Sequence, residues 1–171
     1  LIGSTVLESQ YFVDTTLTAA NSPYFVVNDV TIRDGVTLTI ENGVEIWYND
    51  SESDSESASI YVRGSIIVGC HSIDTVNVHS RGLVDNATYT YIHGPLNRYR
   101  NGIRIDTDNA NQDFQLKFCN VVFEGFSTEW NFYLGQLSSY YKNVSFDNCE
   151  FKANILITPT AVSYTHLTLP T

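Results

Sequence analysis

The sequence has 171 residues, 43% hydrophobic and 13% aromatic, which is enough for one domain with its own core and excludes a disordered tail. Its 19 acidic and 9 basic residues give a net charge of -10, which argues against nucleic acid and anionic membranes as partners, because both require basic patches. No apolar run approaches the roughly 18 residues of a membrane span, and residues 1–20 lack the basic start and apolar block of a signal peptide.

Both ends of the chain indicate a piece of a longer protein. The sequence contains no Met and starts at Leu1. Residues 162–171, VSYTHLTLPT, resemble the translation of a sequencing adapter, so we set them aside; the alternative is a genuine Thr-rich terminal strand. A cut array of repeats exposes strand edges and core at both ends, so residues 1–161 alone are expected to aggregate or fold poorly.

The first part of the chain has the alternation of a β protein. Residues 1–21 form an opening segment with short apolar patches, and Tyr24–Val27 is the next predicted strand. Residues 29–48 read DVTIRDGVTLTIENGVEIWY, in which three apolar alternations each end at a polar turn or at Tyr48. Period-two spacing predicts three strands with one side in the core and with threonines and Glu45 facing water.

An acidic run interrupts this pattern. Residues 49–59, NDSESDSESAS, have no apolar period and are predicted to be a solvated loop. Carboxylates at every second position would also suit Ca²⁺, but the run lacks the Gly turn and the terminal Glu of a calcium loop. The strand pattern then resumes at residues 60–62, 66–68 and 76–78.

A longer period emerges when the apolar-x-Gly closures are aligned. The closure Val62-Arg63-Gly64 recurs at Ile92 and Phe123 and, with Ala in place of Gly, at Phe151, with steps of 30, 31 and 28 residues. A regular repeat that holds several short strands predicts a solenoid, because each turn must bury its inner side against a neighbour. The residues predicted to form one interior column are Ile32, Val62, Ile92, Phe123 and Phe151.

The turns of such a solenoid carry their own signals. Gly residues at the turns are expected to supply left-handed backbone conformations. Asn120 and Asn148 occupy equivalent positions in the last two repeats and are expected to stack in an amide ladder.

The competing fold is an antiparallel β-sandwich. Asp34-Gly35 and Asn42-Gly43 are strong signals for two-residue hairpins, which would make residues 29–48 a meander. A sandwich gives no reason for closures at a near-constant spacing, whereas a solenoid does. We therefore expect an all-β parallel β-helix over residues 22–157, followed by a tail over residues 158–171.

Two stretches of the chain resemble right-handed parallel β-helix proteins of the pectin-lyase-like class. Residues 30–48, VTIRDGVTLTIENGVEIWY, are similar to the opening of that class, and residues 59–80, SIYVRGSIIVGCHSIDTVNVHS, to its following strands. Residues 101–105 and 146–154 resemble later turns, although Arg100-Asn101-Gly102-Ile103 stands where the class often has Trp-x-Gly-Ile. The resemblance is specific for the fold and unspecific for the function.

Few residues have the spacing that catalysis requires. Carbohydrate-active β-helix enzymes use clustered carboxylates that bind Ca²⁺ beside an Arg or Lys base, or a pair of Asp residues. Arg104 and Asp106 share one strand face, but no second Asp cluster aligns with them in the repeat. His93 has no partner at a useful spacing and is expected to face outward. We predict no catalytic, metal-binding or cofactor-binding residues, and no cofactor.

The odd number of cysteines fixes no disulfide framework. Cys70, Cys119 and Cys149 lack the spacing of metal ligands and are expected to be structural or free thiols. Cys149 aligns with Val121 in the repeat and is expected in the core, whereas Cys119 aligns with Asp147 and is expected to face outward.

Aromatic residues exceed what the interior columns require. Because the apolar face of an aromatic ring stacks on sugars, the candidates for glycan stacking are Trp130, Tyr133 and Tyr140; the alternative is packing against the sheets. Three N-x-S/T sequences, at Asn49, Asn86 and Asn143, are candidate N-glycosylation sites in a eukaryotic secretory setting and give weak support for an extracellular location.

Two hypotheses for the function follow. In the first, the chain is a non-catalytic scaffold or adhesive binding region, extracellular or at the cell surface. Its partners would be a polysaccharide or cell-surface glycan and the remaining turns of the parent chain, without nucleic acid or membrane insertion. In the second, it is part of an extracellular polysaccharide lyase or glycoside hydrolase whose active site lies outside this stretch. Degradation of acidic and neutral polysaccharides by the full-length protein separates the two.

Overall fold

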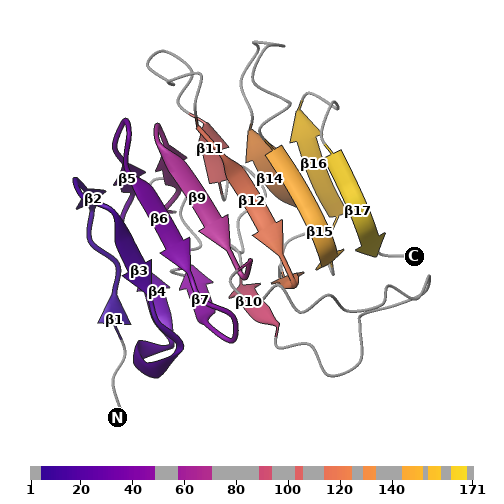
Figure 1. Ribbon diagram of the computed structural model, residues 1–171, viewed down its shortest axis with the longest axis horizontal. Helices are drawn as coiled ribbons and strands as arrows, with labels where there is room; N and C mark the ends of the chain where they lie inside the picture. The colour runs from indigo at the N-terminus through magenta and orange to yellow at the C-terminus, as the bar shows by residue number, and fades with distance from the viewer. Residues whose placement is uncertain are drawn as a thin grey trace.

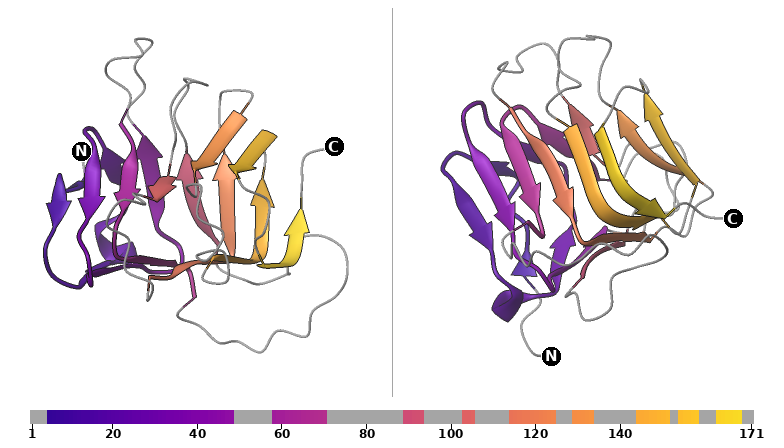
Figure 2. Two further views of the ribbon diagram at one scale, coloured as in Figure 1. Left: turned by 90° about the horizontal axis from the view of Figure 1, so that it is seen from above. Right: turned by 45° about the vertical axis from the view of Figure 1, so that its right-hand side comes forward.

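The chain folds as a parallel β-helix, in which the backbone coils and places strands of successive turns side by side (Figure 1, Figure 2). The computed structural model describes residues 5–48, 58–70, 89–93, 103–105, 114–124, 129–133, 144–151, 154–158 and 163–168. All strand pairings among these residues are parallel. One full turn of the helix is called a rung below.

One wall of the helix is a six-stranded sheet that takes one strand from each rung. It consists of β2 (Gln10–Tyr11), β5 (Val30–Ile32), β8 (Ile60–Val62), β11 (Ile103–Ile105), β14 (Glu129–Tyr133) and β16 (Asn154–Thr158).

An 11-stranded sheet forms the other two walls, which we call the front wing and the lower wing after their places in Figure 1. The front wing contains β3 (Thr15–Leu17), β6 (Thr37–Ile40), β9 (Ser65–Val68), β12 (Leu116–Cys119), the first half of β15 (Val144–Phe151) and β17 (Ser163–Thr168). The lower wing contains β1 (Thr5–Val6), β4 (Tyr24–Val26), β7 (Glu45–Tyr48), β10 (Thr90–His93), β13 (Val121–Glu124) and the second half of β15.

The parallel pairing excludes the β-sandwich alternative. The turns at Asp34-Gly35 and Asn42-Gly43 do not make hairpins, because β5 pairs with β2 and β8, while β6 pairs with β3 and β9. Residues 162–171, which we set aside, include β17, and β17 pairs in parallel with β15. Their expected origin in an adapter stays a prediction.

Strict alternation builds the core. In β6 and β7 every second side chain points inward, and Leu38, Ile40 and Ile46 are at most 1% exposed. The residues between them, including Thr39 and Glu45, are half-buried or exposed on the outer side. The period-two prediction for residues 29–48 is therefore confirmed.

Four phenylalanines fill the interior of the later rungs. Phe118 stacks on Phe146 with ring centroids 5.0 Å apart, and Phe123 stacks on Phe151 at 4.6 Å. Phe123 also meets Phe118 and Phe146 edge-on, at 5.4 and 6.1 Å. All four are at most 1% exposed, and burying each contributes about 1.5–3 kcal/mol to stability before the entropic cost of folding.

The predicted interior column is wrong in one respect, because it joins two columns that lie on different walls. On the six-stranded sheet Ile32 pairs with Val62, and Val62 pairs with Ile105. Ile92 belongs to the lower wing, where Phe123 is its partner, and Phe123 in turn pairs with Phe151.

An unequal rung length explains the error. Hydrogen bonds between adjacent rungs join residues 23, 30 and 28 apart, but the bond from the Gln115 N–H to Ser65 Oγ spans 50 residues. The step of 30 from Val62 to Ile92 is therefore a step to another wall within a lengthened rung.

Both Gly and Asn residues adopt the left-handed backbone conformation at turns. Gly35, Gly43 and Gly69 have positive φ, as predicted, and so do Asn120 (φ 55°) and Asn148 (φ 49°). Asn tolerates this conformation better than most residues because its short polar side chain bonds locally. Gly64 is required for a different reason, since a Cβ there would lie 2.1 Å from the carbonyl oxygen of Val36.

One further expectation needs correction. The acidic run 49–59 is not solvated to its end, because Ala58 and Ser59 are buried and the Ser59 N–H donates to Asp29 Oδ1 at 2.9 Å. In the first rung Tyr11 and Tyr24 are buried, whereas Val6, Phe12 and Val13 are exposed. The expected poor folding of residues 1–161 alone stays a prediction.

Candidate binding surfaces

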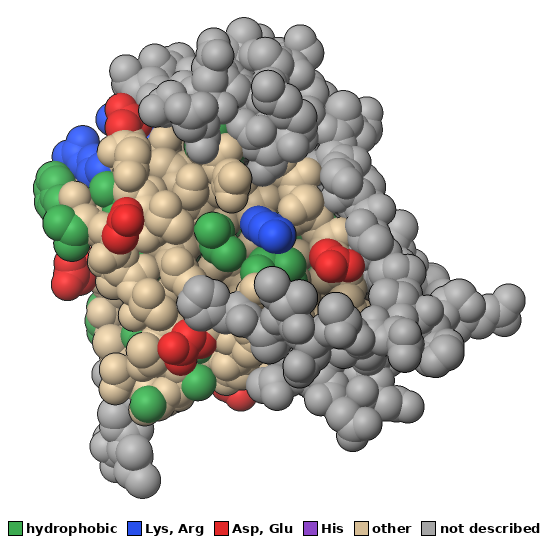
Figure 3. Space-filling model, viewed as in Figure 1, with side chains coloured by type: hydrophobic (Ala, Val, Ile, Leu, Met, Phe, Trp, Pro, Cys, Tyr) green, Lys and Arg blue, Asp and Glu red, His purple; other side chains and the backbone are tan. Residues whose placement is uncertain are grey.

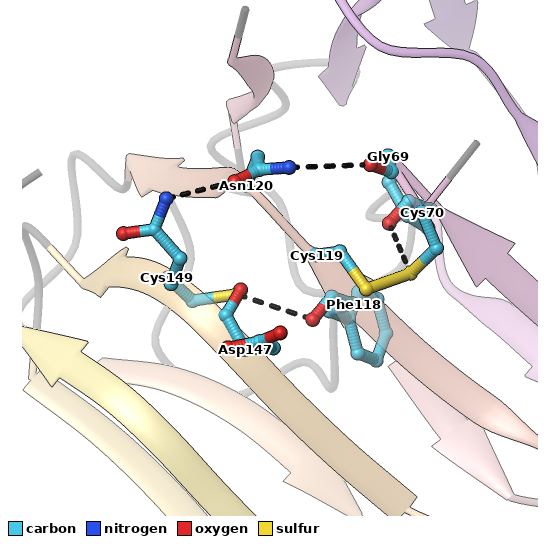
Figure 4. Close-up of a disulfide and its surroundings, with 9 residues drawn as sticks. Gly69, Cys70, Phe118, Cys119, Asn120, Asp147 and Cys149 are labelled. Atoms are coloured by element: carbon cyan, nitrogen blue, oxygen red, sulfur yellow. Dashed lines mark hydrogen bonds between the residues drawn. A yellow bond between two sulfur atoms is a disulfide. The ribbon is translucent and has the colours of Figure 1, made fainter. Parts of the chain in front are cut away.

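A disulfide joins two rungs at the corner between the front and lower wings. Cys70 lies two residues after the end of β9, Cys119 ends β12, and the two are 49 residues apart in sequence with Cα atoms 4.9 Å apart (Figure 4). The odd number of cysteines left the disulfide pairing open, and the structure joins Cys70 to Cys119. Strand pairing brings the two cysteines together. Phe118, just before Cys119, pairs with Val68, which lies two residues before Cys70.

The third cysteine is a buried thiol, as predicted. Cys149 is 0% exposed, and its burial raises the pKa of the thiol to about 12, partly offset by hydrogen bonds to backbone carbonyls. The thiol therefore stays protonated at neutral pH, which makes it a poor nucleophile.

The predicted amide ladder runs along the same corner. Asn148 Nδ2 donates to Asn120 Oδ1 at 2.7 Å, and Asn120 Nδ2 donates to the carbonyl oxygen of Gly69 at 3.5 Å (Figure 4). Asn148 Nδ2 also donates to the Tyr89 hydroxyl at 3.0 Å. Three rungs are thus connected through side chains at one corner.

The chain also re-enters the fold at this corner. The buried Thr90 hydroxyl donates to the Glu41 carbonyl oxygen at 3.0 Å, and the Thr90 N–H donates to the Asn120 carbonyl oxygen at 3.0 Å. A Cβ on Gly69 would lie 3.6 Å from Thr90 Oγ1, so residues 69 and 90 lie close together. The disulfide therefore fixes the chain at Cys70, and the hydrogen bond of Tyr89 fixes it again at residue 89.

Strand pairing places Arg104 in register between two tyrosines of the six-stranded sheet. Arg104 on β11 pairs with Tyr61 on β8 and with Tyr133 on β14. Arg104 is exposed and Tyr61 half-buried, whereas their neighbours Ile60 and Ile103 are buried. We call Tyr61, Arg104 and Tyr133 the arginine–tyrosine row; adjacent members are about 4.8 Å apart along the helix axis.

The structure places the other predicted site residues differently. Trp130 pairs with Ile155 and lies two residues from Phe132, which pairs with the buried Ile103, so it does not share the register of the arginine–tyrosine row. Tyr140 and the three candidate glycosylation sites, Asn49, Asn86 and Asn143, lie outside the described residues. The roles proposed for all of these residues stay predictions.

A second outward cluster, on the lower wing, was not selected from the sequence. Trp47 and Glu45 lie on β7, with Phe25 paired to Trp47 on one side and Tyr91 paired to Glu45 on the other. Glu45 is exposed and the three aromatic side chains are half-buried. Trp47 Nε1–H donates to Glu45 Oε2 at 3.2 Å, which fixes the indole against the carboxylate. We call Phe25, Glu45, Trp47 and Tyr91 the acid–aromatic patch.

The alternation in residues 44–48 contains a signal for this patch, because it places Glu45 and Trp47 on the outer side. Pairing with Tyr91 depends on the length of the second rung, which the sequence pattern does not reveal. His93, the other residue considered for chemistry on this wing, pairs with Trp47 and Glu124, while Asp106 lies outside the described residues.

The outer side of the front wing carries a mixed row in its described residues. This row pairs Thr16 with Thr39, Thr39 with Ile67, Ile67 with Lys117 and Lys117 with Ser145. Acidic and basic side chains are both scattered over this face (Figure 3). The described residues include no group of three His, Cys, Asp or Glu side chains able to hold a metal ion. They also include no helix with the length and apolar character of a membrane span.

The fold defines the chain as a parallel β-helix protein with an inter-rung disulfide. Compared with models of protein families, with curated proteins and with solved structures, the chain has no match.

Proposed function

We propose that the chain is a non-catalytic binding scaffold for glycans, extracellular or at the cell surface, and a relative of the pectin-lyase-like β-helix proteins that its sequence resembles. The observation that carries the proposal is the arginine–tyrosine row. Parallel stacking repeats outward side chains at about 4.8 Å, so a row of ring and guanidinium groups can contact successive units of an extended polymer. Tyr supplies apolar contact and a hydroxyl, and Arg supplies five N–H donors for sugar oxygens.

The disulfide supports the proposed location. Disulfides between structural cysteines persist in secreted, surface and periplasmic proteins and are rare in the reducing cytosol. Cys70 and Cys119 are held together by the pairing of β9 with β12, as expected for a structural bridge. The disulfide supports this location independently of the three candidate glycosylation sites.

The residues in register with Arg104 support a binding surface. Both register partners, Tyr61 and Tyr133, are tyrosines, which suit contact with sugars. The second hypothesis, an enzyme with its active site elsewhere, becomes an outcome of the test below.

A glycan array followed by titration of the best-bound oligosaccharide tests the proposal. Tyr61→Ala should weaken binding by up to about tenfold, because one ring contact contributes roughly 0.5–1.5 kcal/mol. Thr39→Ala, on the outer side of the front wing and away from the row, is the matched control and should leave the affinity within about twofold. Equal affinities for wild type and Tyr61→Ala would overturn the assigned surface, and new reducing ends or unsaturated products would overturn the non-catalytic assignment.

A further inference from the structure

The lower wing carries outward charges of one sign on its described strands. Its outward carboxylates are Glu45, Glu124 and Glu150, and none of its described strands contains Lys or Arg. Arg104, by contrast, is the exposed charge on β11 of the six-stranded sheet. A ligand on the lower wing therefore meets negative potential and aromatic rings together.

The geometry of the acid–aromatic patch fixes these groups relative to one another. Glu45 and Trp47 are two residues apart on one strand and point to the same side. The Glu45 N–H donates to Ser22 Oγ at 2.9 Å, and its carboxylate accepts the Trp47 indole N–H. A carboxylate has about four acceptor positions, so one bond from the indole leaves capacity for a further donor. Phe25 and Tyr91 flank this pair on the two neighbouring strands.

The chemistry that suits this arrangement is an organic cation. Trp is the best cation–π partner among side chains, and Tyr and Phe also attract a cation over the ring. A nearby carboxylate adds attraction and, for a primary ammonium, accepts a charge-assisted hydrogen bond. Sugars without charge gain from the rings but not from the carboxylate's charge, so the patch selects for positive charge.

We propose that the acid–aromatic patch binds an ammonium group presented by a ligand. The group could belong to a quaternary ammonium such as choline, to a lysine side chain or to an amino sugar, which share this chemistry. The site lies on another wall from the arginine–tyrosine row and does not depend on the glycan proposal.

The test is calorimetric titration of the purified full chain with three probes: choline, lysine methyl ester and glucosamine. The control ligand is the uncharged isostere of choline, in which a quaternary carbon replaces the nitrogen. At least one ammonium probe should bind in the millimolar range, at least about fivefold more tightly than the isostere, and the best probe identifies the source of the group. Failure of all three probes, or equal binding of the isostere, would overturn the proposal.

Variants assign the binding to the patch. Trp47→Leu should weaken the best probe about tenfold and Glu45→Gln about threefold, because Glu45 is exposed and its charge is screened by solvent. Glu8→Gln, an exposed carboxylate in the first rung, and Trp130→Phe are controls that should leave the affinity unchanged. Circular dichroism checks that each variant is folded, and Trp47→Phe, which keeps a ring, should lose less than Trp47→Leu. Equal affinity in wild type and folded Trp47→Leu contradicts the site.

Discussion

The arginine–tyrosine row and the acid–aromatic patch are built on the same parallel ladder yet present opposite charges. In both, tyrosine lies beside one exposed charged residue, Arg104 in the row and Glu45 in the patch. The inner sides beneath them are equally apolar, with Ile103 and Ile46 both 1% exposed. The difference shows that a β-helix separates fold from recognition: inward positions fix the stack, and outward positions decide what each wall binds.

The largest effect on stability is expected in the phenylalanine core of the later rungs. Phe123 stacks on Phe151 and contacts Phe118 and Phe146 edge-on, so Phe123→Ala leaves a cavity in two rungs. We expect the free energy of unfolding to fall by about 3–5 kcal/mol and both binding activities to decline together. Urea unfolding measures the loss, with the exposed Lys117→Ala as control. A loss below about 1 kcal/mol would mean that the interior relaxes into the cavity.

Removal of the disulfide should affect binding at the two surfaces unequally. The double variant Cys70→Ala, Cys119→Ala is expected to lose about 2–4 kcal/mol, because the bridge closes a loop of 49 residues. Tyr91 lies just after the corner where the chain re-enters, whereas Tyr61 lies before it. Ammonium binding should therefore weaken more than glycan binding at a temperature where the variant is folded.

Reduction of the disulfide in a chain that keeps Cys70 and Cys119 should reproduce this result. Cys149→Val is the background for the experiment, since it removes the third thiol and Val occupies the equivalent position 121 in the preceding rung. An unchanged unfolding midpoint after reduction would show that strand pairing alone holds the corner.

The sequence predicted much of the stack but not its corner. Period-two alternation placed Ile46 and Tyr48 inside, and the 28-residue step between Asn120 and Asn148 predicted their amide bond, because both signals are local or lie in rungs of regular length. The Cys70–Cys119 pairing and the contact of Glu45 with Tyr91 depend on the lengthened second rung. A register across a rung of unequal length cannot be inferred from a periodic pattern.

The amide ladder gives an intermediate effect and a test of the corner's backbone. Asn148→Ala removes the amide that donates to Asn120 and Tyr89 and forces Ala into a left-handed conformation. We expect a loss of about 2 kcal/mol for Asn148→Ala and about 1 kcal/mol for Asn148→Gly, which keeps the backbone unstrained. Thermal unfolding of both variants separates the two contributions. Equal losses would assign the whole effect to the amide hydrogen bonds.

The smallest change in stability should give the clearest contrast between the surfaces. Glu45→Gln and Arg104→Gln each neutralise one exposed charge and should alter the free energy of unfolding by no more than about 0.5 kcal/mol. Binding should respond in opposite ways: Glu45→Gln weakens the ammonium ligand and spares the glycan, and Arg104→Gln does the reverse. Titration of each variant with both ligands, at low and physiological salt, measures this pattern, and salt should reduce the ammonium effect because exposed charges are screened. If either variant weakened both ligands equally, the two walls would be coupled, and recognition in this β-helix could not be divided wall by wall.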